Sequence, residues 1–413
     1  MQILSKVFHP FKRLLLFKIT PAGRYLIGAM FLTSCMGILN MNVPIFHLSV
    51  GLFYLFVATL LAAFLFKPRI NVSVEMPEKV SVSQVVEVKF KIKNRSRIPA
   101  FDIGADIFSL EHFIENLHES AVINQLSRHE ESELDLTLVP RKRGIYELKD
   151  ADIFSTFPFN LWRKGIRCPM KPLTVFPQYF PLTSINMRIG SRYQPGGMLF
   201  SSNTGESPEY IGNREYRSGD MLRKIDFKSW ARLTKPTVKE YHEEYYCRIA
   251  LVLDTFVDPR LKKGPYGYFQ LEAAVSLAAS IAEYISEDEF ILDIFAVGPE
   301  LYTFRSGRSI AHFENVLEVL SCVEECAASP FEEIAPDFMK ELANITSVIF
   351  ILLDWDDERE DFVKKTVESN CFTKAVIVRN RETTNDIKTL EECVDSFTIV
   401  SPEHIRNGTV EHL

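Results

Sequence analysis

The chain has 413 residues, which is too long for one ordinary hydrophobic core and predicts two or three domains. Its net charge of −7 excludes a protein that works mainly by coating nucleic acid with a basic surface. The seven cysteines are odd in number and scattered, which indicates free thiols in a reducing compartment.

A long uncharged stretch lies near the N-terminus. No Asp, Glu, Lys or Arg occurs from Tyr25 to Phe66, whereas one crossing of a bilayer takes about 20 apolar residues. Two asparagines and a proline break the stretch in its middle. We therefore expect two transmembrane helices, at Tyr25–Met41 and Phe46–Phe66, joined by a tight turn.

Positive charge flanks this hairpin, which covers residues 25–69. Lysine and arginine occur in residues 1–24 and again just after Phe66, and the central turn has neither. By the positive-inside rule both ends of the hairpin face the cytoplasm, and residues 1–24 form a basic cytoplasmic segment. The expected location is the cell (inner) membrane, as a multi-pass protein with the bulk of the chain in the cytoplasm.

Two other interpretations of the uncharged stretch stay open. Leu32-Thr33-Ser34-Cys35 resembles the cleavage box of a bacterial lipoprotein, although the apolar run before it is short and a second run follows at once. The other alternative is a buried hairpin in a soluble core, but such a hairpin rarely stays uncharged over so long a stretch.

A period-two pattern begins at Ile70 and predicts β-structure. Apolar and polar side chains alternate from Ile70 to Met76, and they do so again at Val86–Ile92 and Leu134–Leu138. Several short strands in succession predict a small antiparallel β-sandwich at residues 70–177. The module contains no catalytic cluster, and its expected role is spacing and docking.

The rest of the chain is predicted to be a linker with a motif, at residues 178–248, and then an α/β domain at 249–413. Strand-like and helix-like segments alternate in the second part, which predicts a doubly wound sheet whose ligand edge lies at the carboxyl ends of its strands. The strand-like runs are Ile249–Asp254, Phe290–Ala296, Ser347–Leu353, Lys374–Val378 and Phe397–Val400, and the helix-like runs are Leu271–Ile285, Ile310–Leu320 and Phe331–Ala343.

Standard catalytic signatures are missing from the sequence. There is no GxxxxGK phosphate loop, no GxGxxG and no GxSxG elbow. His242 has no second histidine in the register of a zincin, and the other histidines show no spacing typical of metal ligands. These observations favour a protein without catalysis of its own and without a bound cofactor.

Three acids, Asp254, Asp258 and Asp354, are the candidate ligands of a degenerate metal site. Asp254 ends the first strand of the α/β domain, where a carboxylate binds a hard cation such as Mg²⁺. Von Willebrand factor A domains carry Asp-x-Ser-x-Ser there, but Phe256 and Asp258 stand at the two serine positions. Asp354, at another strand end, adds a carboxylate. Because Phe256 offers no oxygen, we expect weak or no Mg²⁺ binding and favour a docking edge without metal.

The stretch from Gly212 to Leu233 mixes arginine, lysine and aromatic residues with acids. Between residues 209 and 248 there are nine Lys or Arg and seven Asp or Glu. This near balance favours internal or interfacial ion pairs, so we expect a structural joint in which Arg232 pairs with Asp220 or Asp226. A small-ligand or catalytic site, and a surface for nucleic acid or lipid headgroups, are the alternatives.

The same stretch resembles the defining motif of the bacterial family called domain of unknown function 58. The residues that carry this resemblance are Arg214, Tyr216, Gly219, Asp220, Arg223, Asp226, Ala231, Arg232, Lys239 and Glu240. The sequence departs from the family pattern at Phe227, where the family usually has Trp, and at Trp230, where a small residue is usual. The resemblance implies a von Willebrand A-like domain, no assigned enzymatic activity, and a MoxR-type AAA+ ATPase as partner.

These inferences combine into one expected function. The protein is expected to be a membrane-anchored cytoplasmic scaffold that docks a MoxR-type AAA+ ATPase or a client protein. The alternatives are an enzyme of unknown reaction, with its site at Asp220, Asp226 and Arg232 in the 212–243 motif, and a binder of anionic lipid or nucleic acid. No nucleic-acid partner is expected from the acidic composition.

Overall fold

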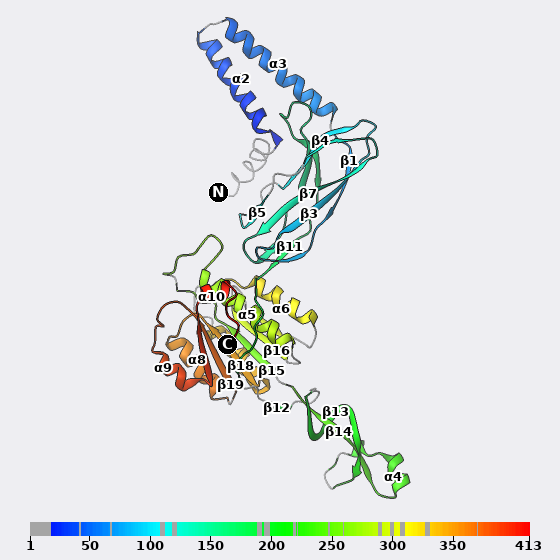
Figure 1. Ribbon diagram of the computed structural model, residues 1–413, viewed down its shortest axis with the longest axis vertical. Coiled ribbons are helices and arrows are strands. Elements are labelled where there is room, and N and C mark those ends of the chain that lie inside the picture. The colour runs from blue at the N-terminus through cyan, green and yellow to red at the C-terminus, as the bar shows by residue number, and fades with distance from the viewer. Residues whose placement is uncertain are drawn as a thin grey trace. The chain divides into compact units, whose positions relative to one another are not determined.

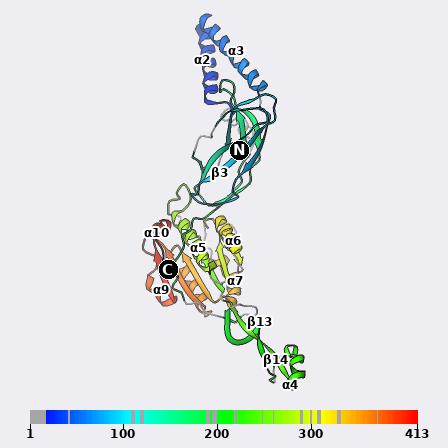
Figure 2. The same cartoon turned by 45° about the vertical axis from the view of Figure 1, so that its right-hand side comes forward.

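The computed structural model consists of two compact units, Met1–Val175 and Phe176–Leu413 (Figure 1), and Figure 2 shows the chain from a second side. The structure describes residues 18–40, 43–66, 68–107, 112–117, 122–187, 192–193, 199–217, 220, 222–246, 248–258, 260–287, 291–297, 301–305, 310–326, 331–369 and 371–413.

The first unit begins with two antiparallel helices, α2 (Pro21–Asn40) and α3 (Val43–Leu65), which lie side by side in both views (Figures 1 and 2). They approach closely at Gly37, where a Cβ atom would lie 3.3 Å from the backbone of Phe46. Among the described residues only α3 is long and apolar enough to cross a membrane. The prediction of two such helices is wrong in this respect, because α2 begins early enough to include Arg24 and has fewer large apolar side chains.

Three sheets follow the helices in the first unit. One four-stranded antiparallel sheet has the order β1-β3-β7-β5, and a second has the order β10-β9-β4-β6. A three-stranded sheet has the order β2-β11-β8. The strands are β1 (Ile70–Glu75), β2 (Lys79–Ser81), β3 (Val86–Asn94), β4 (Ala100–Ile107), β5 (Ile114–Asn116), β6 (Ile123–Leu126), β7 (Glu131–Pro140), β8 (Gly144–Tyr146), β9 (Ala151–Ser155), β10 (Lys164–Cys168) and β11 (Leu173–Phe176).

The sheets of this unit share one hydrophobic core. Phe90 and Leu136 from the first sheet lie in the same buried cluster as Ile103 and Ile153 from the second. Burial alternates residue by residue along β3, as the period-two pattern predicts. Two antiparallel sheets that enclose one core have the arrangement expected of a sandwich.

The second unit is built around a six-stranded sheet with the order β17-β16-β15-β18-β19-β20. All neighbouring pairs are parallel except β16 and β17. The predicted doubly wound arrangement is therefore observed, with one antiparallel edge strand that the sequence did not reveal. The strands are β15 (Arg248–Leu253), β16 (Ile291–Val297), β17 (Leu301–Arg305), β18 (Ser347–Leu352), β19 (Phe372–Val378) and β20 (Ser396–Val400).

Helices pack on both faces of this sheet. Side chains of α5 (Phe269–Glu287), α6 (Ile310–Cys322) and α10 (Pro402–Arg406) belong to the buried cluster on one face. Those of α7 (Phe331–Glu341), α8 (Asp357–Val367) and α9 (Ile387–Cys393) belong to the cluster on the other. The strands are buried on both faces, which explains why β15 and β18 read as continuous apolar runs.

Described parts of the region predicted as linker and motif pack on the second unit and form a sheet of their own. Leu182 lies in the core of the second unit, and the N–H of Asn186 donates to the carbonyl of Leu413 at 2.5 Å. The chain then forms an antiparallel sheet with the order β12-β14-β13. Its strands are β12 (Arg192–Tyr193), β13 (Leu199–Glu215) and β14 (Thr237–Tyr246).

Candidate functional site

A cleft lies at the carboxyl edge of the six-stranded sheet. Its volume is about 680 Å³, and Phe256, Gln270, Asp354 and Arg359 are among the residues that line it. Neighbouring strands β15 and β18 end here, and the helices that follow them, α5 and α8, pack on opposite faces of the sheet. Open α/β sheets bind their ligands at this kind of reversal in strand order.

An arginine is buried beside the first strand-end acid. The side chain of Asp254 is fully buried, and Nε of Arg359 donates to its Oδ2 at 2.8 Å. The N–H groups of Leu353 and Phe256 donate to the same carboxylate at 2.9 and 3.0 Å. Arg359 also pairs with Asp356 and donates to the carbonyl of Phe256 at 3.0 Å. Burial raises the pKa of the Asp254 carboxyl, and the guanidinium opposes that rise.

The second strand-end acid is paired in the same way. Asp354 forms an ion pair with Arg379, and it accepts hydrogen bonds from the hydroxyl of Thr384 at 2.7 Å and from the N–H of Trp355 at 2.8 Å. Burial acts to raise the pKa of Asp354, but the hydrogen bonds from Thr384 and Arg379 hold it below its usual value. Asp354 is therefore an ionised carboxylate whose charge is matched locally.

The three predicted metal ligands do not come together as a cation site. Asp254 and Asp354 are paired with arginines, and the exposed Asp258 accepts the N–H of Arg260 at 2.9 Å. Within the described part of the chain, no group of three or more His, Cys, Asp or Glu side chains is placed to hold a metal ion. Since Arg359 supplies the positive charge beside Asp254, this arrangement does not fit Mg²⁺.

The motif forms its own local network on the β13–β14 hairpin. Both terminal nitrogens of Arg214 donate to the two carboxylate oxygens of Asp220, each at 2.8 Å. The N–H of Arg217 donates to Asp220 at 2.8 Å. The side chain of Arg214, and then the N–H of Arg217, lower the pKa of Asp220 to about 2.

The second motif acid begins a helix. Asp226 is the N-cap of α4 (Phe227–Leu233), and it accepts the N–H groups of Lys228 and Ser229 at 3.1 and 3.2 Å. Its other oxygen accepts the side-chain amide of Asn213 at 2.9 Å and the hydroxyl of Ser229 at 2.8 Å. The side chains of Asn213 and Ser229 are the largest causes that lower the pKa of Asp226 to about 2.

Arg232 does not pair as expected. It is exposed on α4, and no described residue forms an ion pair with it. The reason is that Asp220 is paired with Arg214, while Asp226 caps the helix. Of the other motif residues, Arg223, Ala231 and Lys239 are exposed, and Tyr216 is half-buried. Gly219 and the side chain of Glu240 lie outside the described residues.

An apolar surface is exposed beside this network. It consists of Leu222, Phe227, Trp230 and Leu233 and is called the α4 tip below. The rings of Phe227 and Trp230 stack with centroids 6.1 Å apart, and Phe227 is 67% exposed. Large apolar side chains this exposed are typical of an interaction surface rather than a core. Leu222 belongs to the short helix η2 (Leu222–Lys224).

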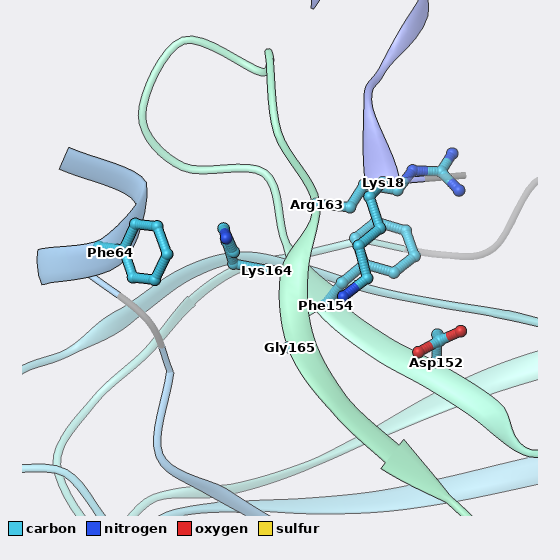
Figure 3. Close-up of a pocket in the computed structure, with 7 residues that line it drawn as sticks. All are labelled: Lys18, Phe64, Asp152, Phe154, Arg163, Lys164 and Gly165. Carbon is cyan, nitrogen blue, oxygen red and sulfur yellow. The ribbon is translucent and has the colours of Figure 1, made fainter. Parts of the chain in front are cut away.

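A second, smaller cavity lies at the end of α3, and Figure 3 shows it. Its volume is about 130 Å³. The ammonium group of Lys164 lies 3.9 Å from the ring centroid of Phe64 on α3, and Arg163 lies over Phe154. The indole of Trp162 packs against Phe56, also on α3. Aromatic and basic side chains at the end of an apolar helix are typical of a membrane interface.

The comparison with known families concerns the motif and the α/β sheet. Residues 212–382 match the family of proteins of unknown function DUF58. The matched DUF58 segment contains the β13–β14 motif, both arginine-paired acids and most of the cleft, so the resemblance seen in the motif is supported. No curated protein matches the chain.

Solved structures give only distant likenesses. A protein of unknown function from Porphyromonas gingivalis W83 is 17% identical, with a TM-score of 0.18 over 30% of this chain and 62% of that one. An Escherichia coli alpha-2-macroglobulin activated by porcine elastase is 12% identical, with a TM-score of 0.20 over 35% and 11%. The chain thus spans less than two thirds of either protein, and likenesses at these scores carry no argument about the DUF58 segment.

Two residues of the site were missed by sequence reasoning. Arg359 and Arg379 follow strands β18 and β19, but nothing in the local pattern marks them as partners of strand-end acids. Arg359 lies 105 positions from Asp254. Only the three-residue spacing from Asp356 to Arg359, on one face of a helix, could have indicated a local ion pair.

Proposed function

We propose that the protein is a membrane-anchored cytoplasmic scaffold that docks a MoxR-type AAA+ ATPase, or a client of it, without catalysis of its own. The proposal rests on a contrast between paired acids and exposed apolar side chains. The acids of the motif and of the sheet edge are matched by local donors, whereas the apolar side chains of the α4 tip have no cover in the described structure. A surface of this kind binds rather than catalyses.

The enzyme alternative has weaker support. Its site would need Asp220, Asp226 and Arg232 to converge on a concave pocket. Instead, Asp220 pairs with Arg214, Asp226 caps α4, and Arg232 is exposed. The low pKa of both carboxyls suits ion pairing and capping, and it is far from the neutral range that suits a general base.

The membrane anchor is proposed from α3 and its surroundings. We infer that α2, although less apolar, crosses beside α3, because α2 ends at Asn40, α3 begins at Val43, and the two helices are antiparallel neighbours. Both ends of the pair then lie on one side, with Lys164 and Trp162 at the interface. The positive-inside rule places that side in the cytoplasm.

The α/β domain is proposed to be of the von Willebrand A type. Its antiparallel edge strand, its strand order and the acid at the end of β15 support this assignment. Phe256 in place of the first serine, and Arg359 beside Asp254, make it a variant that works without a metal.

Co-purification tests the proposed function. Full-length protein is extracted from membranes with a co-expressed MoxR-type ATPase, and the bound ATPase is quantified. The double substitution Phe227→Ala and Trp230→Ala should reduce binding by about tenfold or more, as loss of an aromatic anchor does. Ile145→Ala removes an apolar side chain of the β-module that is 57% exposed, a value between those of Trp230 and Phe227, and should leave ATPase binding unchanged. If the double variant retains the ATPase as well as the unchanged protein does, the α4 tip is not the docking surface.

A further inference from the structure

In the cleft at the sheet edge, three cationic side chains but only one carboxylate, that of Asp258, form no ion pair with a described residue. Five cationic side chains and three carboxylates line it. Arg359 and Arg379 are held by the strand-end acids described above. Arg260, Lys262 and Arg381 are exposed, and they form no ion pair with any described residue. A chain with a net charge of −7 thus presents unmatched cations at its ligand edge.

Four backbone N–H groups at this edge already donate to acids and are not free to hold a phosphate. Phosphate sites in α/β domains rely on N–H groups near a strand end. Here the N–H groups of Phe256 and Leu353 donate hydrogen bonds to Asp254. The N–H of Arg260 donates to Asp258, and the N–H of Trp355 donates to Asp354. An incoming anion would therefore meet side-chain guanidinium and ammonium groups, and guanidinium matches a carboxylate with two parallel hydrogen bonds.

The positions of the unpaired cations around the cleft favour an extended chain over a single small anion. The three cations come from two separate loops, one after β15 and one after β19, and Leu261, Phe269 and Pro402 also line the space. A volume of about 680 Å³ accommodates several side chains. Cations from two loops with apolar residues beside them suit a segment that alternates acidic and apolar side chains.

We propose that this cleft binds an acidic peptide segment of a partner protein, through Arg260, Lys262 and Arg381. The inference rests on the proposed function only in taking the occupant to be a protein. The peptide would run along the carboxyl edge of the sheet, with its carboxylates paired to exposed cations and its apolar side chains against Leu261 and Phe269. Binding of this kind weakens as salt rises.

A peptide assay tests this proposal without the ATPase. Full-length protein in nanodiscs of neutral lipid is titrated with a fluorescent peptide of four Glu-Ala repeats, and a peptide of four Gln-Ala repeats serves as the matched probe. The Glu peptide should bind and the Gln peptide should not. The double substitution Lys262→Glu and Arg381→Glu should lower the affinity for the Glu peptide by about tenfold, because each exposed charge pair contributes up to about fivefold. Lys388→Glu, an exposed cation on α9 that does not line the cleft, should leave affinity unchanged.

Three outcomes would overturn the proposal. Equal binding of the Gln peptide would show that carboxylates are not recognised, and an equal loss in Lys388→Glu would show that only net charge matters. Complete displacement by millimolar inorganic phosphate would identify a small-anion site instead. Because the assay contains no ATPase, its failure leaves the α4 tip experiment unaffected, and failure of the α4 tip experiment leaves this one unaffected.

Discussion

Replacing Arg359 by Met should strongly destabilise the second unit. Met keeps much of the side-chain volume but leaves Asp254 buried without its ion pair and the carbonyl of Phe256 without its donor. Removing one partner of a buried pair costs roughly 3–5 kcal/mol. A unit of this size loses roughly 2–4 °C of melting temperature per kcal/mol, so the variant should melt roughly 6–20 °C lower.

The effect should also depend on pH, and the sign follows from Asp254. Burial holds the pKa of this carboxyl above its unfolded value even with Arg359 present. Without the guanidinium the pKa rises further, so the folded variant favours the protonated acid. Stability is then retained at low pH and lost as pH rises through the folded pKa. The difference from the unchanged protein should be smaller at pH 5 than at pH 8.

Thermal melts of the full-length protein in detergent measure this by tryptophan fluorescence, to which the buried Trp355, next to Asp354, contributes together with Trp162 and Trp230. Asp254→Asn added to Arg359→Met should recover part of the loss, because no buried charge remains. Lys388→Met, at an exposed position, should shift stability by no more than about 0.5 kcal/mol. A melting temperature for Arg359→Met within the error of the unchanged protein would refute the buried ion pair as a structural element.

Three further predictions concern other parts of the chain. In a background without native cysteines, a cysteine at Val43 should react with an impermeant reagent added to intact cells and one at Ser73 should not; the reverse pattern would contradict the topology. The motif should keep its local structure down to about pH 4 and lose it as pH falls toward 2, since Asp220 and Asp226 both have a pKa of about 2. Hydrogen-exchange protection factors, corrected for the intrinsic rate at each pH, that are equal at pH 7 and pH 2.5 would disprove this. Arg232→Ala should change the melting temperature little, because the side chain is exposed, and a fall of several degrees would reveal a partner.

Much of the α/β domain could be predicted because its signals are local. A strand buried on both faces is a continuous apolar run, and β15 and β18 were found on that basis. Strand β17 was missed, and so was the long strand β13, because its sequence is rich in Gly, Ser and Asn, which favour turns. The pairing with β14 that holds β13 in place is long-range and leaves no local pattern.

In the candidate site, too, the local features could be predicted from the sequence and the long-range contacts could not. The acids at strand ends were visible in the sequence, because a strand that ends in Asp is a local feature. The identity of their partners was not, since Arg359 and Asp254 meet only after β15, β18 and α8 have assembled. The pairing expected for Arg232 was wrong for a similar reason. Proximity in the sequence does not show that Asp220 pairs with Arg214 on β13 instead.

The guanidinium beside Asp254 has a consequence for regulation. A domain whose ligand edge is completed by a divalent ion can be emptied and refilled, so the ion supply or a chelator turns its binding on and off. Here the positive charge is part of the polypeptide, is 2% exposed and cannot dissociate. The cleft proposed above for an acidic segment therefore needs no ion to complete it, and release of that segment has to come from the partner, for example through the nucleotide state of an ATPase.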